Sequence, residues 1–170
     1  GPKEPMKKAL NIDSDGSIVS DYEGLLISEV MTSNTSALPD EKGRFSDWAE
    51  IWNSTDRQIN LEGLTLSDRS DRAKFVFPKK ILNPDDRVIV YLDGRNQNDE
   101  DKPFHAKFKL SSIGESLFMF DTSGFVISSV DIPTLNANET YYLNEAGEYV
   151  KGENIYSPGF ENTKEGHEAY

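Results

Sequence analysis

The segment from Phe45 to Asp68 reads FSDWAEIWNSTDRQINLEGLTLSD, and its side chains alternate as in two β-strands joined by a polar turn. Successive strand residues point to opposite faces. One face of the first strand carries Trp48, Glu50 and Trp52. The other face carries Ala49, Ile51 and Asn53. Apolar spacing resumes from Ile59 to Leu66 after the turn, so this segment predicts a half-buried sheet.

The rest of the chain repeats this pattern of short strands and turns. Branched and aromatic side chains predict strands at 25–31, 73–77, 87–92, 104–110, 116–120, 125–130, 140–143 and 148–151. Asp121–Gly124 and Asn144–Gly147 are predicted hairpin connections, because glycine adopts the left-handed backbone that such turns need. Without any long helical periodicity, these signals predict an all-β sandwich of about eight to ten short strands.

The predicted core comes from the inward positions of these strands. Its members are Ile27, Val30, Ala49, Ile51, Leu61, Leu66, Phe77, Val88, Val90, Phe108, Leu110, Leu117, Phe125 and Val130.

Composition narrows the classes of function. The 170 residues suit one domain, with 18 basic against 30 acidic residues and a net charge of -12. Such a balance repels phosphate backbones, so no nucleic-acid partner is expected. No cysteine is present, which excludes disulfides and thiolate zinc sites. No apolar run is long enough to predict a membrane span.

The termini differ in composition from the centre. Residues 1–24 are polar, contain proline and glycine, and are predicted to form a linker or N-terminal arm. The start at Gly1 rather than Met favours a trimmed or mature chain whose export signal was removed. Residues 25–162 form the predicted domain, and 163–170 a polar tail leading to a further domain.

The N-terminal arm contains a weak candidate metal site. Asn11, Asp13 and Asp15 have the spacing of the first oxygen ligands in a calcium loop, and Gly16 stands at the turn position. Tyr22 occupies the position where the bidentate acid is expected. The segment is therefore either a calcium site or an acidic turn in a linker, and no other cofactor is expected.

Catalytic patterns are missing from the sequence. The two histidines are His105 and His167. His167 lies in the polar tail, and His105 is predicted on the outward face of its strand, beside lysines. No nucleophile elbow occurs. We therefore expect no enzymatic activity.

The face with Trp48, Glu50 and Trp52 is the candidate binding site. If this face is exposed, it suits stacking on a sugar ring or contact with a partner protein. Alternatively, a loop or the terminal arm covers it, and Glu50 accepts backbone N–H bonds. Asn53 is predicted to bind the backbone of the following turn.

An ordered set of motifs resembles one family. The motifs are WAEIWN at 48–53, INLEGLTLSD at 59–68, ISEV at 27–30, FVFP at 75–78, ILNP at 81–84, RVIVYLDG at 87–94, FHAKFKLS at 104–111, GESLFMFDTSG at 114–124 and SPGFEN at 157–162. Together they resemble the lamin tail domain, in particular its bacterial branch, over about Leu25 to Asn162. The resemblance implies an immunoglobulin-like β-sandwich without catalytic residues, used as a module in exported or surface proteins.

The expected function follows from that resemblance. The chain is expected to be a non-enzymatic interaction or adaptor module of a larger exported or surface bacterial protein. Its partners would be a protein, a cell-surface polymer or neighbouring domains of the parent chain, outside the cell or at its surface. The alternative is a carbohydrate-binding module with a calcium-supported fold.

Overall fold

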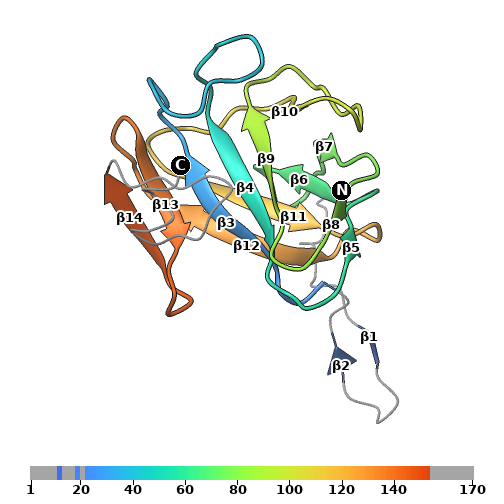
Figure 1. Cartoon of the computed structure of the whole chain (residues 1–170). Helices are drawn as coiled ribbons and strands as arrows, with labels where there is room; N and C mark the ends of the chain where they lie inside the picture. The colour runs from blue at the N-terminus through green and yellow to red at the C-terminus, as the bar shows by residue number, and fades with distance from the viewer. Residues whose placement is uncertain (1–10, 13–17, 20–21, 154–170) are drawn as a thin grey trace.

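The computed structural model describes residues 11–12, 18–19 and 22–153, and Figure 1 shows their arrangement. Every regular element in these ranges is a β-strand. The strands are β1 (Asn11–Ile12), β2 (Ile18–Val19), β3 (Leu25–Met31), β4 (Trp48–Asn53), β5 (Ile59–Asn60), β6 (Thr65–Ser67), β7 (Phe75–Val76), β8 (Ile81–Leu82), β9 (Arg87–Leu92), β10 (Phe104–Ala106), β11 (Glu115–Phe120), β12 (Val126–Ile132), β13 (Glu139–Leu143) and β14 (Tyr149–Glu153). None of the described segments is a helix that could cross a membrane.

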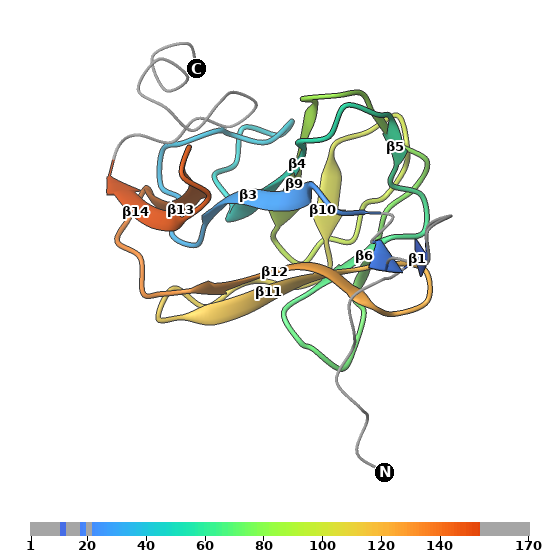
Figure 2. The same ribbon diagram turned by 90° about the horizontal axis from the view of Figure 1, so that it is seen from below.

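Two sheets pack face to face and confirm the predicted all-β sandwich. One sheet has the order β10-β9-β4-β3-β13-β14 and the other β12-β11-β6-β7. Figure 2 shows β3, β4 and β9 in one layer and β11 and β12 in the other. Two small sheets, β1-β2 and β5-β8, complete the fold.

The core lies between the two layers. Ala49 and Ile51 of β4 are fully buried and stand opposite Val90 and Val88 of β9. Twelve of the fourteen predicted core residues are buried, and Val88 is half-buried against the core. Phe125 was predicted wrongly: it is 37% exposed, because it belongs to the turn before β12 begins.

The hairpin predictions are confirmed. Asp121 and Phe125 close the first connection through a backbone hydrogen bond of 2.8 Å, and Gly124 has a φ of 87°. In the second, Asn144 donates to the carbonyl of Glu148, and β13 pairs with both β14 and β3. This hairpin therefore belongs to the larger sheet.

Two strand boundaries differ from the prediction. The predicted second strand of the 45–68 segment divides into β5 and β6, which lie in different sheets. Gly63 makes the change of direction with a φ of 84°, and a Cβ there would lie 2.9 Å from Cγ2 of Thr122. The strand predicted for 104–110 ends at Ala106, although Phe108 and Leu110 remain buried.

Candidate functional site

The predicted contact face of β4 lies on the outer side of the larger sheet, and two of its three residues are inaccessible. Trp48 and Glu50 are fully buried, and Trp52 is half-buried. Trp48 packs with Met31, Ala37 and Tyr91 in a second apolar cluster. Residue 37 belongs to the β3–β4 loop (residues 32–47), which covers this part of the face. Of the two alternatives, a face covered by a loop is therefore correct for Trp48 and Glu50, and an exposed contact surface is wrong for these two residues.

Glu50 and Trp52 are engaged within the fold. The Ser28 hydroxyl donates to Oε1 of Glu50 over 2.6 Å, and Nε of Arg87 lies 3.5 Å from the same oxygen. The Arg87 guanidinium also lies over the Trp52 ring, 4.8 Å from its centroid. Trp52 Nε1 donates to Asp85 over 2.9 Å. The side chains of Ser28 and Arg87 thus contact Glu50, and the Arg87 guanidinium covers a face of the Trp52 ring on which a sugar would stack.

The prediction that Asn53 binds the backbone of the following turn is confirmed. Its amide donates to the carbonyl of Arg57 over 2.8 Å, and Oδ1 accepts from the backbone N–H of Thr55 over 3.0 Å. It also donates to the carbonyl of Leu82 over 3.0 Å, which ties the turn to β8. Asn53 is fully buried, so it is a structural residue.

The candidate calcium ligands fall mostly outside the described ranges. Asn11 begins β1, while Asp13 and Asp15 lie outside them, as does His167. The calcium prediction remains a prediction.

His105 is the functional candidate that the sequence missed. It lies on the face of its strand opposite Phe104 and Ala106, as predicted, but it is only 2% exposed because two loops cover it. Its Nδ1 lies 2.6 Å from Asp93 Oδ2, and its Nε2 lies 2.7 Å from Glu41 Oε1. Its ring stacks on Tyr91, with 5.1 Å between centroids. The alternation of residues 104–110 places His105 on the outer face, but nothing in the pattern predicts that loops cover it.

Two loops enclose His105, and Figure 1 shows both at the same end of the sandwich. Glu41 comes from the β3–β4 loop, 64 residues from His105 in the sequence. Asp93 comes from the β9–β10 loop (residues 93–103). Backbone hydrogen bonds in both directions between Gln97 and His105, of 2.7 and 2.9 Å, hold the second loop against β10. Because its two ring nitrogens contact carboxylates from different loops, the His105 ring ties the two loops together.

Asp40 organises the tip of the β3–β4 loop. Its Oδ1 accepts from the backbone N–H groups of Lys42 and Arg44 at 2.8 and 2.9 Å. Its Oδ2 lies 3.1 Å from Nε of Arg44 and 3.4 Å from a terminal nitrogen of Arg95. Desolvation alone would raise the pKa of Asp40, but these hydrogen bonds and the Arg44 charge hold that pKa below its usual value. The ionised carboxylate thus fixes both arginines.

Hydrogen bonds also stabilise the ionised carboxylate of Glu41. Desolvation raises its pKa, while the hydrogen bonds from His105 and Gln97 outweigh that effect and lower the pKa below its ordinary value. The Gln97 amide donates to Oε2 of Glu41 over 3.0 Å and to the carbonyl of Pro103 over 2.7 Å.

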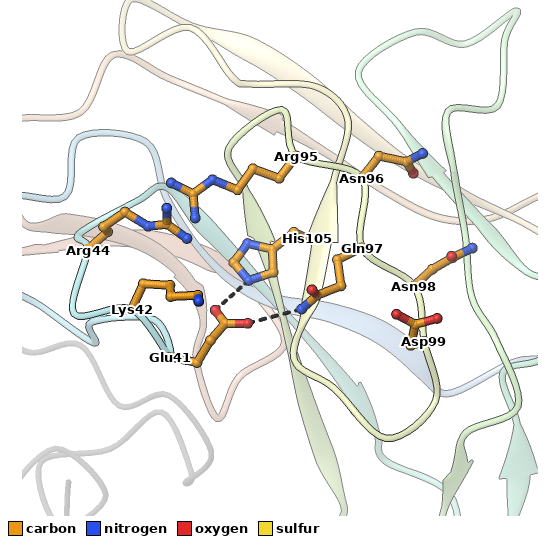
Figure 3. A pocket seen from close by; sticks show the side chains of 9 residues that line it. All are labelled: Glu41, Lys42, Arg44, Arg95, Asn96, Gln97, Asn98, Asp99 and His105. Atoms are coloured by element: carbon orange, nitrogen blue, oxygen red, sulfur yellow. Dashed lines mark hydrogen bonds and ion pairs between the residues drawn. The ribbon is translucent and has the colours of Figure 1, made fainter.

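A hollow of about 500 Å³ opens beside His105, and we call it the arginine hollow (Figure 3). Its walls are Glu41, Lys42, Arg44, Arg95, Asn96, Gln97, Asn98, Asp99 and His105. A second hollow of about 380 Å³ shares Arg44 and Arg95 with it and is lined also by Phe45, Asp47 and Lys109. Burial raises the pKa of Asp47 to about 7, against the opposing effects of the Asn34 backbone N–H and the Lys109 charge.

The grouping of Asp40, Asp93 and His105 raises the question of a metal ion. Their ligand atoms lie within 4.8 Å of one another. However, both oxygens of Asp40 already accept hydrogen bonds, and both ring nitrogens of His105 face carboxylates. The Arg95 guanidinium, 3.4 Å from Asp40 and 3.8 Å from Asp93, supplies the positive charge. Asp40, Asp93 and His105 therefore fit an ion-pair network better than a metal centre.

The same geometry argues against a catalytic triad. In a triad, the Nε2 of histidine faces a nucleophile while Nδ1 faces the orienting acid. In this site Nε2 faces the carboxylate of Glu41, so His105 has a carboxylate on both sides. The arrangement is suited to holding loops in place.

Comparison with known proteins identifies the family. No curated protein matches the chain. A family model, Lamin Tail Domain, matches residues 19–134, which is more than half of the chain. The β13–β14 hairpin lies beyond the matched segment, but β13 pairs with β3 and so continues the same sheet. The matched family comprises non-enzymatic, immunoglobulin-like domains. The all-β sandwich and this match together show that the chain belongs to the lamin tail domain family.

Proposed function

We propose that this domain is a non-catalytic interaction module of a larger exported or cell-surface protein, and that it contacts its partner through the arginine hollow. The observation that carries the proposal is the ion-pair network around the buried side chain of His105. Ordering two long loops costs conformational entropy. The contacts of His105 with Asp93 and Glu41, at 2.6 and 2.7 Å, offset that cost.

The chemistry of the rim supports a role in recognition. The Arg44 and Arg95 side chains are 43% and 36% exposed, although the Asp40 carboxylate between them is fully buried. Phe45, beside them, is 45% exposed. Arginine and aromatic side chains are the residue types most enriched in protein–protein interfaces. The resemblance to bacterial modules of exported proteins supports a place outside the cell or at its surface.

These 170 residues contain no cysteine, so a cysteine introduced at a chosen position of the domain allows a direct test by labelling. Phe45→Cys in the parent protein on intact cells is treated with a membrane-impermeant maleimide that carries a photo-activated cross-linking group. The expected result is a defined cross-linked product, because position 45 is external and lies at the partner interface.

The matched control is Ile113→Cys, since Ile113 is 80% exposed and lines neither hollow. The parent protein without either substitution gives the background. Labelling at both positions without a product specific to position 45 would contradict the interface. Failure of the reagent to reach either cysteine, with labelling restored after lysis, would contradict the location outside the cell.

A further inference from the structure

The arginine hollow also indicates what the partner brings to it. We propose that this hollow is a carboxylate-binding site, which takes one acidic side chain or the C-terminal carboxylate of a partner polypeptide. This inference rests on the interaction function proposed above and specifies its chemistry.

The cationic groups of the hollow converge on one place. Figure 3 shows the charged ends of Lys42, Arg44 and Arg95 gathered beside the His105 ring. They come from both loops, so the His105 network that joins the loops also sets the spacing of these groups.

Both arginines keep donors for a ligand. Within the described part of the chain, Arg44 uses its Nε for Asp40, and no contact engages its terminal nitrogens. Arg95 uses Nε and one terminal nitrogen for Asp93 and Asp40. The remaining terminal N–H groups match a planar carboxylate, which guanidinium groups bind in a fork geometry.

The buried acid beneath the arginines lowers the cost of binding. Asp40 is fully buried and fixes Nε of Arg44 at 3.1 Å and Arg95 at 3.4 Å. The flexible arginine side chains are therefore already ordered before a ligand arrives, and less entropy is lost on binding. The site is preorganised.

The charge balance disfavours a multiply charged anion. Lys42, Arg44 and Arg95 are opposed by four acids close by, namely Asp40, Glu41, Asp93 and Asp99. Glu41 and Asp99 lie in the wall itself and would repel the several charges of a phosphate group. A single carboxylate needs only the free guanidinium donors, and the Asn96 amide can bind its neighbouring peptide groups.

The adjoining hollow favours a polypeptide over a free organic acid. It shares Arg44 and Arg95 with the arginine hollow and extends to the exposed ring of Phe45. A residue next to the bound carboxylate can therefore lay apolar surface on Phe45.

The test is a titration of the isotopically labelled chain, followed by NMR at the backbone amides and at the arginine Nε–H groups. Three blocked peptides are used: acetyl-Gly-Glu-Gly-amide, acetyl-Gly-Gly-Gly with a free carboxylate, and acetyl-Gly-Gln-Gly-amide as the uncharged probe. The expected result is saturable shifts at Arg44, Arg95 and Gln97 with at least one carboxylate peptide and none with the glutamine peptide. The carboxylate peptide that binds identifies the source of the group.

Variants assign the site. Arg44→Gln should weaken binding by about tenfold or more, because a hydrogen-bonded charge pair is lost. Arg44→Lys should restore only part of the affinity, since it keeps the charge and loses the fork. Lys42→Gln leaves the Asp40 contacts in place and should weaken binding by about twofold to threefold. This variant tests the site if the arginine variants do not fold.

The matched control is Arg72→Gln, an exposed arginine outside both hollows, which should bind with unchanged affinity. Equal binding of the glutamine peptide, equal loss in Arg72→Gln, or no saturable shift would overturn the carboxylate site. A cross-link at position 45 combined with a failed titration would leave the interaction function standing and reject only its chemistry.

Discussion

At the scale of single residues, His105 shows how a polar side chain becomes a structural part of a surface. Both of its ring nitrogens face carboxylates from loops that are far apart in the sequence. The period-two pattern of its strand correctly places it opposite Phe104 and Ala106. Burial could not be predicted, because it depends on two loops whose positions have no periodic signal.

Asp47 is expected to make stability depend on pH. Its pKa of about 7 in the folded chain lies above its ordinary value of 3.8 because of burial. Between these values the folded chain holds more protons than the unfolded chain, so stability falls as pH rises from about 4 to 7. The lowered pKa values of Asp40 and Glu41 act below this window, where stability is lost as pH falls.

The check is to compare Asp47→Asn with the unsubstituted chain by urea denaturation at about pH 5 and pH 8. Between pH 5 and pH 8, the free energy of unfolding of Asp47→Asn should rise by about 1–2 kcal/mol relative to that of the unsubstituted chain. This expected effect is kept small because partial solvent exposure screens the charge of Asp47. An equal pH dependence of the two proteins would show that Asp47 titrates normally.

Asn53 is expected to be among the costliest polar residues to remove. Its side chain binds the backbone of Thr55, Arg57 and Leu82 and is fully buried. Asn53→Ala should lower the free energy of unfolding by about 2–4 kcal/mol, because several buried backbone groups lose their partners. Asn53→Asp should cost at least as much at neutral pH, since oxygen would face the carbonyls of Arg57 and Leu82. A loss below about 1 kcal/mol in denaturant unfolding would contradict this role.

At the scale of elements, the bulge in β3 explains a long-range contact of the β13–β14 hairpin. The register of β3 with β4 shifts between Ile27 and Glu29. The Tyr149 hydroxyl donates to the carbonyl of Ile27 over 2.6 Å, and the Ser128 hydroxyl accepts from the N–H of Ile27 over 3.2 Å. Side chains of β14 and β12 thus satisfy the backbone groups of Ile27 beside the bulge.

Removal of the Tyr149 hydroxyl tests this contact. Tyr149→Phe should destabilise the domain by about 1–2 kcal/mol in denaturant unfolding, because the Ile27 carbonyl loses its side-chain donor. Tyr142→Phe, a half-buried tyrosine of the same hairpin, should change stability by less than about 0.5 kcal/mol. Burial raises the pKa of Tyr149 to about 12, so its hydroxyl should resist ionisation in an alkaline absorbance titration. Equal effects of the two substitutions would show that the contact with Ile27 contributes little.

Strand positions were more predictable than strand partners. The alternation in 48–53 and the branched run in 87–92 predict β4 and β9 with their observed boundaries. The same period-two pattern cannot show that β5 and β6 belong to different sheets, because apolar spacing is alike on either side of Gly63. The pairing of β10 parallel to β9 likewise depends on the route of the β9–β10 loop.

At the scale of the whole molecule, the ordered motifs predicted the family, and the sandwich and the family match confirm it. The candidate site was not predictable, since the Trp-Glu-Trp face is packed and the arginine hollow is assembled from two loops. Local patterns report which side of a strand a residue occupies. They carry no information on which loop later covers that side.

The His105 network is expected to hold both loops as one rigid, preorganised rim. The measurement is hydrogen exchange of the backbone amides of Lys42, Arg44 and Gln97, in the unsubstituted chain and in His105→Phe. The phenylalanine ring retains the packing on Tyr91 and removes both ring-nitrogen contacts.

We predict slow exchange at all three amides in the unsubstituted chain and acceleration in His105→Phe by about tenfold or more in both loops together, with the Asp121–Gly124 hairpin unchanged. Exchange at these amides as fast as at the Glu145–Ala146 hairpin tip, or acceleration confined to one loop, would contradict the claim.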